Sequence, residues 1–136
     1  MTYTDDNRGK IQYRNRRKQL IDFSGLRIGD ITPTDCDGII EYHDKAHVLF
    51  EIKSRSVDVP NGQKLAFERM CNDFNRLKKP AVFIVAEHDV DDPAEDIDAA
   101  QCKVRDFYFR GVWYRDKSLL KDLIERFIKF ADGEKP

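Results

Sequence analysis

An acid and a base stand two residues apart in one short stretch of the sequence, Leu49 to Arg55. Glu51 and Lys53 interrupt a run of apolar residues that is typical of a β-strand. Because side chains alternate along a strand, these two side chains share one face. The opposite face then carries the core residues Val48, Phe50 and Ile52. The stretch predicts a polar site on a strand that is anchored by its other face.

A second acid is expected from the preceding strand. Residues 38–43 and 47–54 are rich in Ile, Val, Tyr and Phe and are separated by a polar break, which predicts a β-hairpin. A three-residue turn would place Asp37 opposite Lys53, with directly opposed Cβ atoms about 5 Å apart. Asp37, Glu51 and Lys53 would then form a compact triangle at the far end of the hairpin.

Two carboxylates at that separation repel each other unless a cation lies between them. Lys53 supplies one positive charge, and a divalent metal would supply two. Carboxylate oxygens together with water and a substrate oxygen suit Mg²⁺, which favours phosphate esters. The triangle therefore indicates phosphate chemistry.

Two alternatives stay open at this point. Asp35 has the same parity as Asp37 and competes for the role of first acid, although Asp37 lies closer to Glu51 and precedes Gly38. The strand face that carries Asp37, Glu51 and Lys53 could also be the solvated side of an ordinary amphipathic hairpin. Asp37 and Lys53 would then be paired for solubility.

The elements that must position these residues follow in order along the chain. After the hairpin, apolar residues at spacings of three and four predict a helix over 63–77, and the continuous apolar run 81–86 predicts a central parallel strand. Residues 102–115 read as a strand or a hairpin, and 117–131 as a helix. The order predicts one α/β or α+β domain with a mixed sheet flanked by helices. Its parts are a basic N-terminal helix or arm at about 8–23, a core at about 32–87 and a C-terminal part at about 102–131.

The segments "TPTDCDGIIEY" and "VLFEIKSR" together resemble the PD-(D/E)xK nuclease superfamily. Asp37 matches the first acid, and Glu51-Ile52-Lys53 matches the second acid, spacer and lysine. "QKLAF" is similar to the Q-x-x-x-Y element of some branches, with Phe67 in place of the tyrosine. The resemblance covers about 60 residues, from Thr32 to Glu87, and implies a restriction-endonuclease-like core; small phage, prophage and resolvase-like nucleases are the nearest in size.

The resemblance implies metal-dependent hydrolysis of DNA phosphodiester bonds. Mg²⁺ or Mn²⁺ would be held by Asp37, Glu51 and the backbone carbonyl of Ile52, with Asp35 as the less favoured acid. Lys53 would orient or help deprotonate the attacking water, and Gln63 would position that water or a phosphate. Many members also carry an acid on the first helix, whereas residues 7–21 contain none, so Asp22 or Asp30 would have to serve.

The distribution of charge says more than the net value of −1. Residues 8–18 hold six basic residues and no acid, while residues 87–98 hold seven acids and no Lys or Arg. A basic first helix suits contact with the DNA backbone. The residues expected to contact DNA are Arg14, Arg16, Arg17, Lys18 and Arg55.

Composition narrows the remaining classes. The 136 residues are 40% hydrophobic and 36% charged, and three cysteines without a C-x-x-C spacing predict free thiols in the cytoplasm. We expect neither a membrane span nor a signal peptide. A homodimer is left open. The two rival functions are an inactive nuclease-fold module for nucleic-acid binding or assembly, and an unrelated α+β domain that binds a partner.

Two further groups of residues are weighed and set aside. His43, His47 and the neighbouring Asp44 could mimic a metal cluster, but the hairpin tip is expected roughly 20 Å from Glu51 at about 3.3 Å per residue. The aromatic residues of the segment 107–114 could stack on bases, yet aromatics at strand spacing are more often core residues. They are Phe107, Tyr108, Phe109, Trp113 and Tyr114.

Overall fold

The computed structural model of the chain describes residues 21–133. The chain divides into two compact units, Met1–Thr34 and Asp35–Pro136. Within the first, the described residues form a short 3-10 helix, η3 (Ser24–Leu26), and one isolated bridge between Ile28 and Ile31. Residues 8–20 of the predicted basic helix or arm, which include Arg14, Arg16, Arg17 and Lys18, lie outside the described residues.

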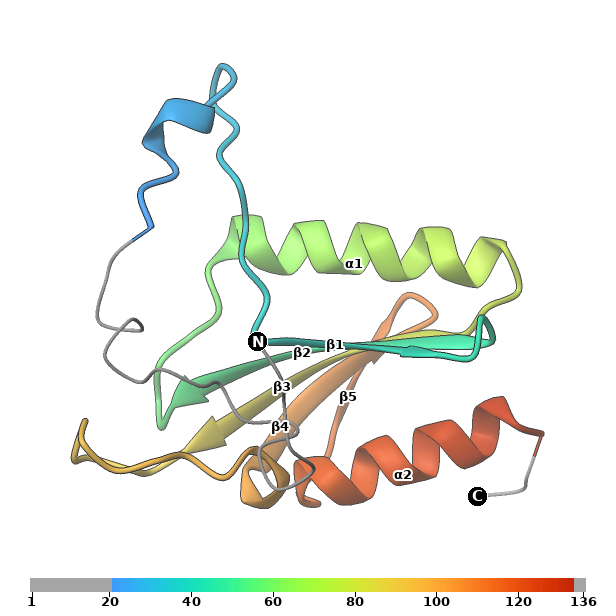
Figure 1. The fold of residues 1–136 in the computed structure, drawn as a ribbon. Helices are drawn as coiled ribbons and strands as arrows, with labels where there is room; N and C mark the ends of the chain where they lie inside the picture. The colour runs from blue at the N-terminus through green and yellow to red at the C-terminus, as the bar shows by residue number, and fades with distance from the viewer. Residues whose placement is uncertain (1–20, 134–136) are drawn as a thin grey trace, which may run out of the picture. The chain divides into compact units, whose positions relative to one another are not determined.

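A five-stranded mixed sheet forms the centre of the second unit, in the order β1-β2-β3-β4-β5 (Figure 1). β2 and β3 run parallel, and the other neighbouring pairs run antiparallel. The strands are β1 (Gly38–Tyr42), β2 (Ala46–Ser54), β3 (Ala81–His88), β4 (Lys103–Phe109) and β5 (Val112–Arg115). With its two helices this is an α+β fold, as predicted, and the hairpin and the central parallel strand are confirmed.

The two helices cover opposite faces of the sheet (Figure 1). They are α1 (Asn61–Arg76), which links β2 to β3, and α2 (Leu120–Ala131) at the end of the chain. Neighbouring residues of β3 serve the two layers in turn: Phe83 packs in the cluster with α1, and Ile84 packs in the cluster with α2. Residues 81–86 are buried for this reason, which explains their continuous apolar pattern.

β4 and β5 form a hairpin whose turn is Arg110-Gly111. Both turn residues have positive φ, 49° and 84°, as a two-residue hairpin turn of the primed type requires. Tyr108 is 6% exposed, and the ring centroid of Trp113 lies 5.8 Å from that of Phe83. These aromatic residues therefore belong mainly to the core, as expected.

A β-bulge in β4 changes which side chains face α1. Val85 pairs with Asp106, but the next residue of β3, Ala86, pairs with Val104, so Arg105 is the extra residue. This irregularity lets Arg105 reach Glu87 on β3.

The acidic segment after β3 forms a loop that leads into a short 3-10 helix, η4 (Ala99–Gln101). The Asp98 carboxylate accepts a hydrogen bond from the backbone N–H of Ala100 at 3.1 Å and so begins that helix. Within residues 21–133, no helix is both long enough and apolar enough to cross a membrane.

Candidate functional site

The β1–β2 hairpin brings the first acid to Glu51 by a register that differs from the predicted one. Gly38 pairs with Phe50 and Tyr42 pairs with Ala46, two residues away from the expected pairing. The turn is residues 43–45, because Ala46 is fully buried in the cluster with α2 and cannot lie in an exposed turn. A shift of two residues keeps every side chain on its face. Asp37 therefore lies beside Glu51, and the predicted position opposite Lys53 is wrong.

Three contacts join the acids and the base. The backbone N–H of Asp37 donates to Glu51 Oε1 at 3.0 Å, and the backbone N–H of Ile52 donates to Asp37 Oδ2 at 2.7 Å. Lys53 Nζ lies 3.7 Å from Glu51 Oε2. The structure thus gathers Asp37, Glu51 and Lys53 at one end of the hairpin, each tied to the backbone or to its neighbour.

Glu51 is a buried carboxyl group, only 2% exposed. The pKa of Glu51 is raised from 4.5 to about 6, chiefly by burial and also by the negative charges of Asp37 and Asp35, against the lowering effects of the Asp37 N–H and the Lys53 charge. Because α1 covers this face of the sheet, the solvated-hairpin interpretation is wrong for Glu51. A buried, electrostatically disfavoured acid is a feature that functional sites often share.

Gln63 in the first turn of α1 fastens the acidic segment to the helix. Its side chain is 9% exposed, and Nε2 donates to the backbone oxygen of Asp35 at 2.8 Å. Asp35 therefore contributes a carbonyl to this contact, and its side chain is exposed. One turn further along α1, Phe67 packs against Phe83 with ring centroids 4.9 Å apart.

The structure explains why residue 38 is a glycine, which the sequence alone did not reveal. A Cβ atom at Gly38 would lie 2.0 Å from Cζ of Phe50, so the Phe50 ring occupies the space above the glycine. The neighbouring Cys36 thiol donates to the Gly38 carbonyl oxygen at 3.2 Å, and burial raises its pKa. Phe50, on the face opposite Glu51, therefore requires a glycine next to Asp37.

Sequence reasoning missed Arg105, which braces the end of β2. Its Nε donates to Glu87 Oε2 at 3.0 Å, and its terminal nitrogens donate to the carbonyl oxygens of Val57 at 2.5 Å and Ser54 at 2.9 Å. Glu87 pairs in register with Lys53, so this network adjoins the charged site. The contacts with Val57 and Ser54 join residues 48 and 51 positions apart, which no local pattern could have linked.

The donor set at this end of the hairpin fits a hard divalent cation. Asp37 and Glu51 supply carboxylate oxygens, and Ile52, which lies between Glu51 and Lys53, supplies a backbone carbonyl. Among the described residues, no three His, Cys, Asp or Glu side chains gather as a metal-binding group. Mg²⁺ commonly uses one or two carboxylates and keeps several waters, so the chemistry of this smaller set is compatible with it.

The other predicted site residues lie elsewhere. Arg55 is exposed and lines a cavity at the end of β2. The ring of His47 stacks on that of Phe74 with centroids 3.9 Å apart, and His47 lies near the opposite end of the hairpin from Asp37. In the first unit, Asp22 accepts a hydrogen bond from the Ser24 N–H, and Asp30 lies 3.9 Å from Arg27.

Comparison with family models, with curated proteins and with solved structures found no match for this chain. The functional argument therefore rests on the residues and contacts described above.

The raised pKa of Glu51 predicts a pH-dependent stability. The folded protein holds this proton more tightly than the unfolded chain, so the stability contribution is complete below pH 4.5 and is lost as pH rises through 6. A shift from 4.5 to about 6 corresponds to about 2 kcal/mol. Glu51→Gln should therefore gain about 2 kcal/mol in unfolding free energy at pH 7.5 and almost nothing at pH 4.

Urea unfolding at both pH values measures this gain. Glu125→Gln, an exposed acid on α2, is the matched control and should show no such difference between the two pH values. A Glu51→Gln gain that is equal at pH 4 and pH 7.5 would contradict the assignment of the shift to this group.

Proposed function

We propose that this protein is a metal-dependent nuclease of the PD-(D/E)xK type that hydrolyses DNA phosphodiester bonds. The observation that carries the proposal is the buried Glu51, which accepts from the Asp37 N–H and lies 3.7 Å from the Lys53 ammonium. A protein has little structural reason to bury an acid whose pKa is raised in this way. Binding of a cation and a phosphate ester would be a functional reason to bury Glu51.

Each residue of the site has a distinct role in this proposal. Asp37, Glu51 and the Ile52 carbonyl would hold Mg²⁺ or Mn²⁺, which supplies charge neutralisation at the phosphate and a more acidic water. Lys53 holds a positive charge beside Glu51 and would stabilise the negative charge that grows on the phosphate. Gln63 keeps the acidic segment in place through the Asp35 carbonyl.

DNA is the proposed partner, with Arg55 and the N-terminal basic residues as contacts to the phosphate backbone. The three cysteines are free thiols in the structure, which favours a reducing compartment and supports a cytoplasmic location. A homodimer would allow two strands to be addressed by two such sites.

The test of the proposal is cleavage of plasmid and branched DNA with Mg²⁺, with Mn²⁺ and with chelator. Metal-dependent cutting by the wild type supports the nuclease. DNA binding without cutting would favour the inactive nucleic-acid-binding or assembly module. Absence of both would favour the α+β domain that binds another partner.

Metal binding should also appear as added thermal stability. A cation that binds only the folded protein stabilises it by about 1.4 kcal/mol at ten times its Kd, so Mn²⁺ should raise the Tm. Asp37→Asn should abolish that rise, because it removes a charge while an amide oxygen can still accept from the Ile52 N–H. Differential scanning fluorimetry over a range of Mn²⁺ concentrations measures the effect.

Asp91→Asn provides the control, because Asp91 is an exposed acid in the loop after β3. It should respond to Mn²⁺ like the wild type. If Asp91→Asn loses the rise and Asp37→Asn keeps it, the cation binds the acidic loop and the proposed metal site is wrong.

A further inference from the structure

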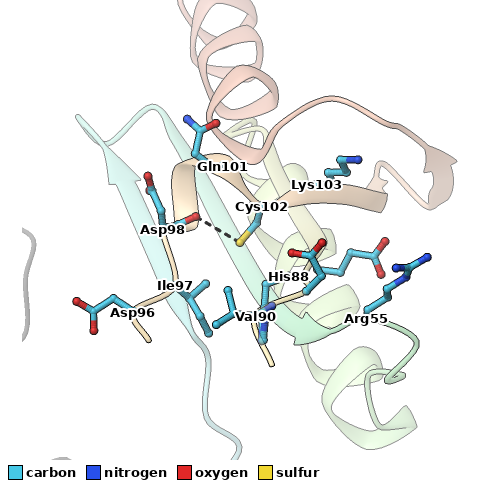
Figure 2. A pocket seen from close by; sticks show the side chains of 11 residues that line it. Arg55, His88, Val90, Asp96, Ile97, Asp98, Gln101, Cys102 and Lys103 are labelled. Atoms are coloured by element: carbon cyan, nitrogen blue, oxygen red, sulfur yellow. Dashed lines mark hydrogen bonds between the residues drawn. The ribbon is translucent and has the colours of Figure 1, made fainter. Parts of the chain in front are cut away.

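A cavity of about 470 Å³ opens beside the charged site, at the carboxyl ends of β2 and β3 (Figure 2). Small-molecule sites in proteins commonly measure about 300–1,000 Å³, so its size suits a ligand such as a nucleotide. Its walls come from the ends of β2 and β3, the acidic loop, η4 and the start of β4. All of these elements belong to the second unit.

Strand register fixes the distance between the cavity and the site. Lys53 pairs with Glu87, Ser54 pairs with His88, and Glu87 pairs on its other side with Lys103. Glu87, His88 and Lys103 line the cavity. Two strand spacings, roughly 10 Å, therefore separate Lys53 from Lys103 across the sheet. The cavity therefore begins one strand away from Lys53, at Glu87.

Charged side chains of both signs line the cavity. Figure 2 shows Arg55 and Lys103 toward one end and Asp96 and Asp98 toward the other, and the carboxylates of Glu87 and Asp89 also line it. Less polar side chains line the space between the two ends: Val90, Ile97 and Cys102. Arg55 directly follows β2 and Lys103 begins β4, so Arg55 is two residues from Lys53 along the chain and Lys103 is two strands away.

His88 adds a flat ring to the wall, and two contacts hold this ring in place. Nδ1 accepts from the backbone N–H of Val90 at 3.1 Å, and Nε2 lies 3.4 Å from the Ser54 hydroxyl. The imidazole ring offers a flat surface on which a base can stack.

We propose that the cavity binds one unpaired nucleotide of the DNA strand, a proposal that rests on the nuclease function above. The phosphate lies at Arg55 and Lys103, and the base lies against Ile97 and His88. The carboxylates at the far end accept hydrogen bonds from an exocyclic amino group, which cytosine and adenine carry and thymine lacks. A paired base cannot enter such a cavity, so the substrates are branched, flapped or single-stranded DNA.

Nucleotide binding in the absence of cleavage tests this directly. The full chain in EDTA is titrated with dCMP and with dTMP, and the bound fraction is followed by NMR and calorimetry. We expect dCMP to bind at least about tenfold more tightly than dTMP, as one well-placed hydrogen-bonding pair allows. Glu51→Gln should bind dCMP like the wild type, because the cavity does not use that residue.

Three variants locate the nucleotide. Ile97→Trp should fill the cavity and lower dCMP affinity at least about tenfold, whereas Leu77→Trp, at an exposed apolar residue just after α1, should leave it unchanged. Asp96→Asn should bring the affinities for dCMP and dTMP close together, since an amide can donate to thymine as well as accept from cytosine.

The outcomes separate this proposal from the nuclease function. DNA cleavage by wild type without measurable dCMP binding overturns the cavity proposal and leaves the nuclease standing. Binding of dCMP that Ile97→Trp does not weaken overturns it too, as does equal binding of dTMP by the wild type. Binding of an arginine-rich peptide in place of nucleotides would identify the cavity as a site for basic peptide. Selective dCMP binding without cleavage of any DNA supports the cavity and refutes the nuclease.

Discussion

Glu51→Gln should lower metal-dependent DNA cleavage by at least about 10³-fold while the protein stays folded. A metal ion contributes several kcal/mol to such a reaction, and each 1.36 kcal/mol corresponds to about tenfold in rate. The substitution removes the charge but keeps the shape and an oxygen that accepts from the Asp37 N–H. Single-turnover cleavage of a labelled branched substrate in Mn²⁺ measures the loss.

The control and the stability result sharpen this expectation. Glu125→Gln on α2, on the other side of the sheet, should cleave at the wild-type rate. Because Glu51→Gln should also be more stable at pH 7.5, unfolding cannot explain its loss of activity. Full activity in a folded Glu51→Gln protein would show that Glu51 has no role in cleavage and would contradict the proposed mechanism.

Lys53→Met should lower cleavage by about 10²-fold to 10³-fold, the range typical for loss of one positioned electrostatic group. Methionine keeps most of the unbranched side chain and removes the ammonium that lies 3.7 Å from Glu51. The remaining carboxyl group then loses the charge that lowers its pKa, so that pKa should rise above about 6. In the profile of cleavage rate against pH, the acidic limb should therefore shift to higher pH.

A matched substitution separates this role from general charge. Lys121→Met removes an exposed lysine of α2 and should change neither the rate nor its pH profile. Lys53→Arg should recover only part of the rate, because a planar guanidinium does not replace a compact ammonium at a fixed position. A pH profile for Lys53→Met that matches the wild type would show that Lys53 does not act on Glu51.

The hairpin was predictable because its signal is local. Strand alternation alone put Glu51 and Lys53 on the same face, and the structure confirms that face. The register was predicted two residues away from the observed one, because the burial of Ala46 depends on packing against α2. Because the error was two residues, each side chain stayed on its predicted face, and Asp37, Glu51 and Lys53 still lie at one end of the hairpin.

The sequence predicted which residues form the site better than it predicted how buried they are and which contacts hold them. A strand with charged residues on one face looks solvated in sequence, yet α1 covers that face and leaves Glu51 only 2% exposed. The brace formed by Arg105 also had no sequence signal, because it depends on a bulge in β4 and on contacts between distant parts of the chain.

By itself, the sequence determined the elements and the faces of their side chains, since apolar periodicity and turn residues act over a few positions. It thereby assigned Asp37, Glu51 and Lys53 to one place. Only the tertiary structure decided that Glu51 is buried, that its pKa rises to about 6 and that a cavity lined by charged side chains lies at the same end of the sheet. These properties depend on which segments pack together, because burial and charge act through space between residues that are distant in the chain.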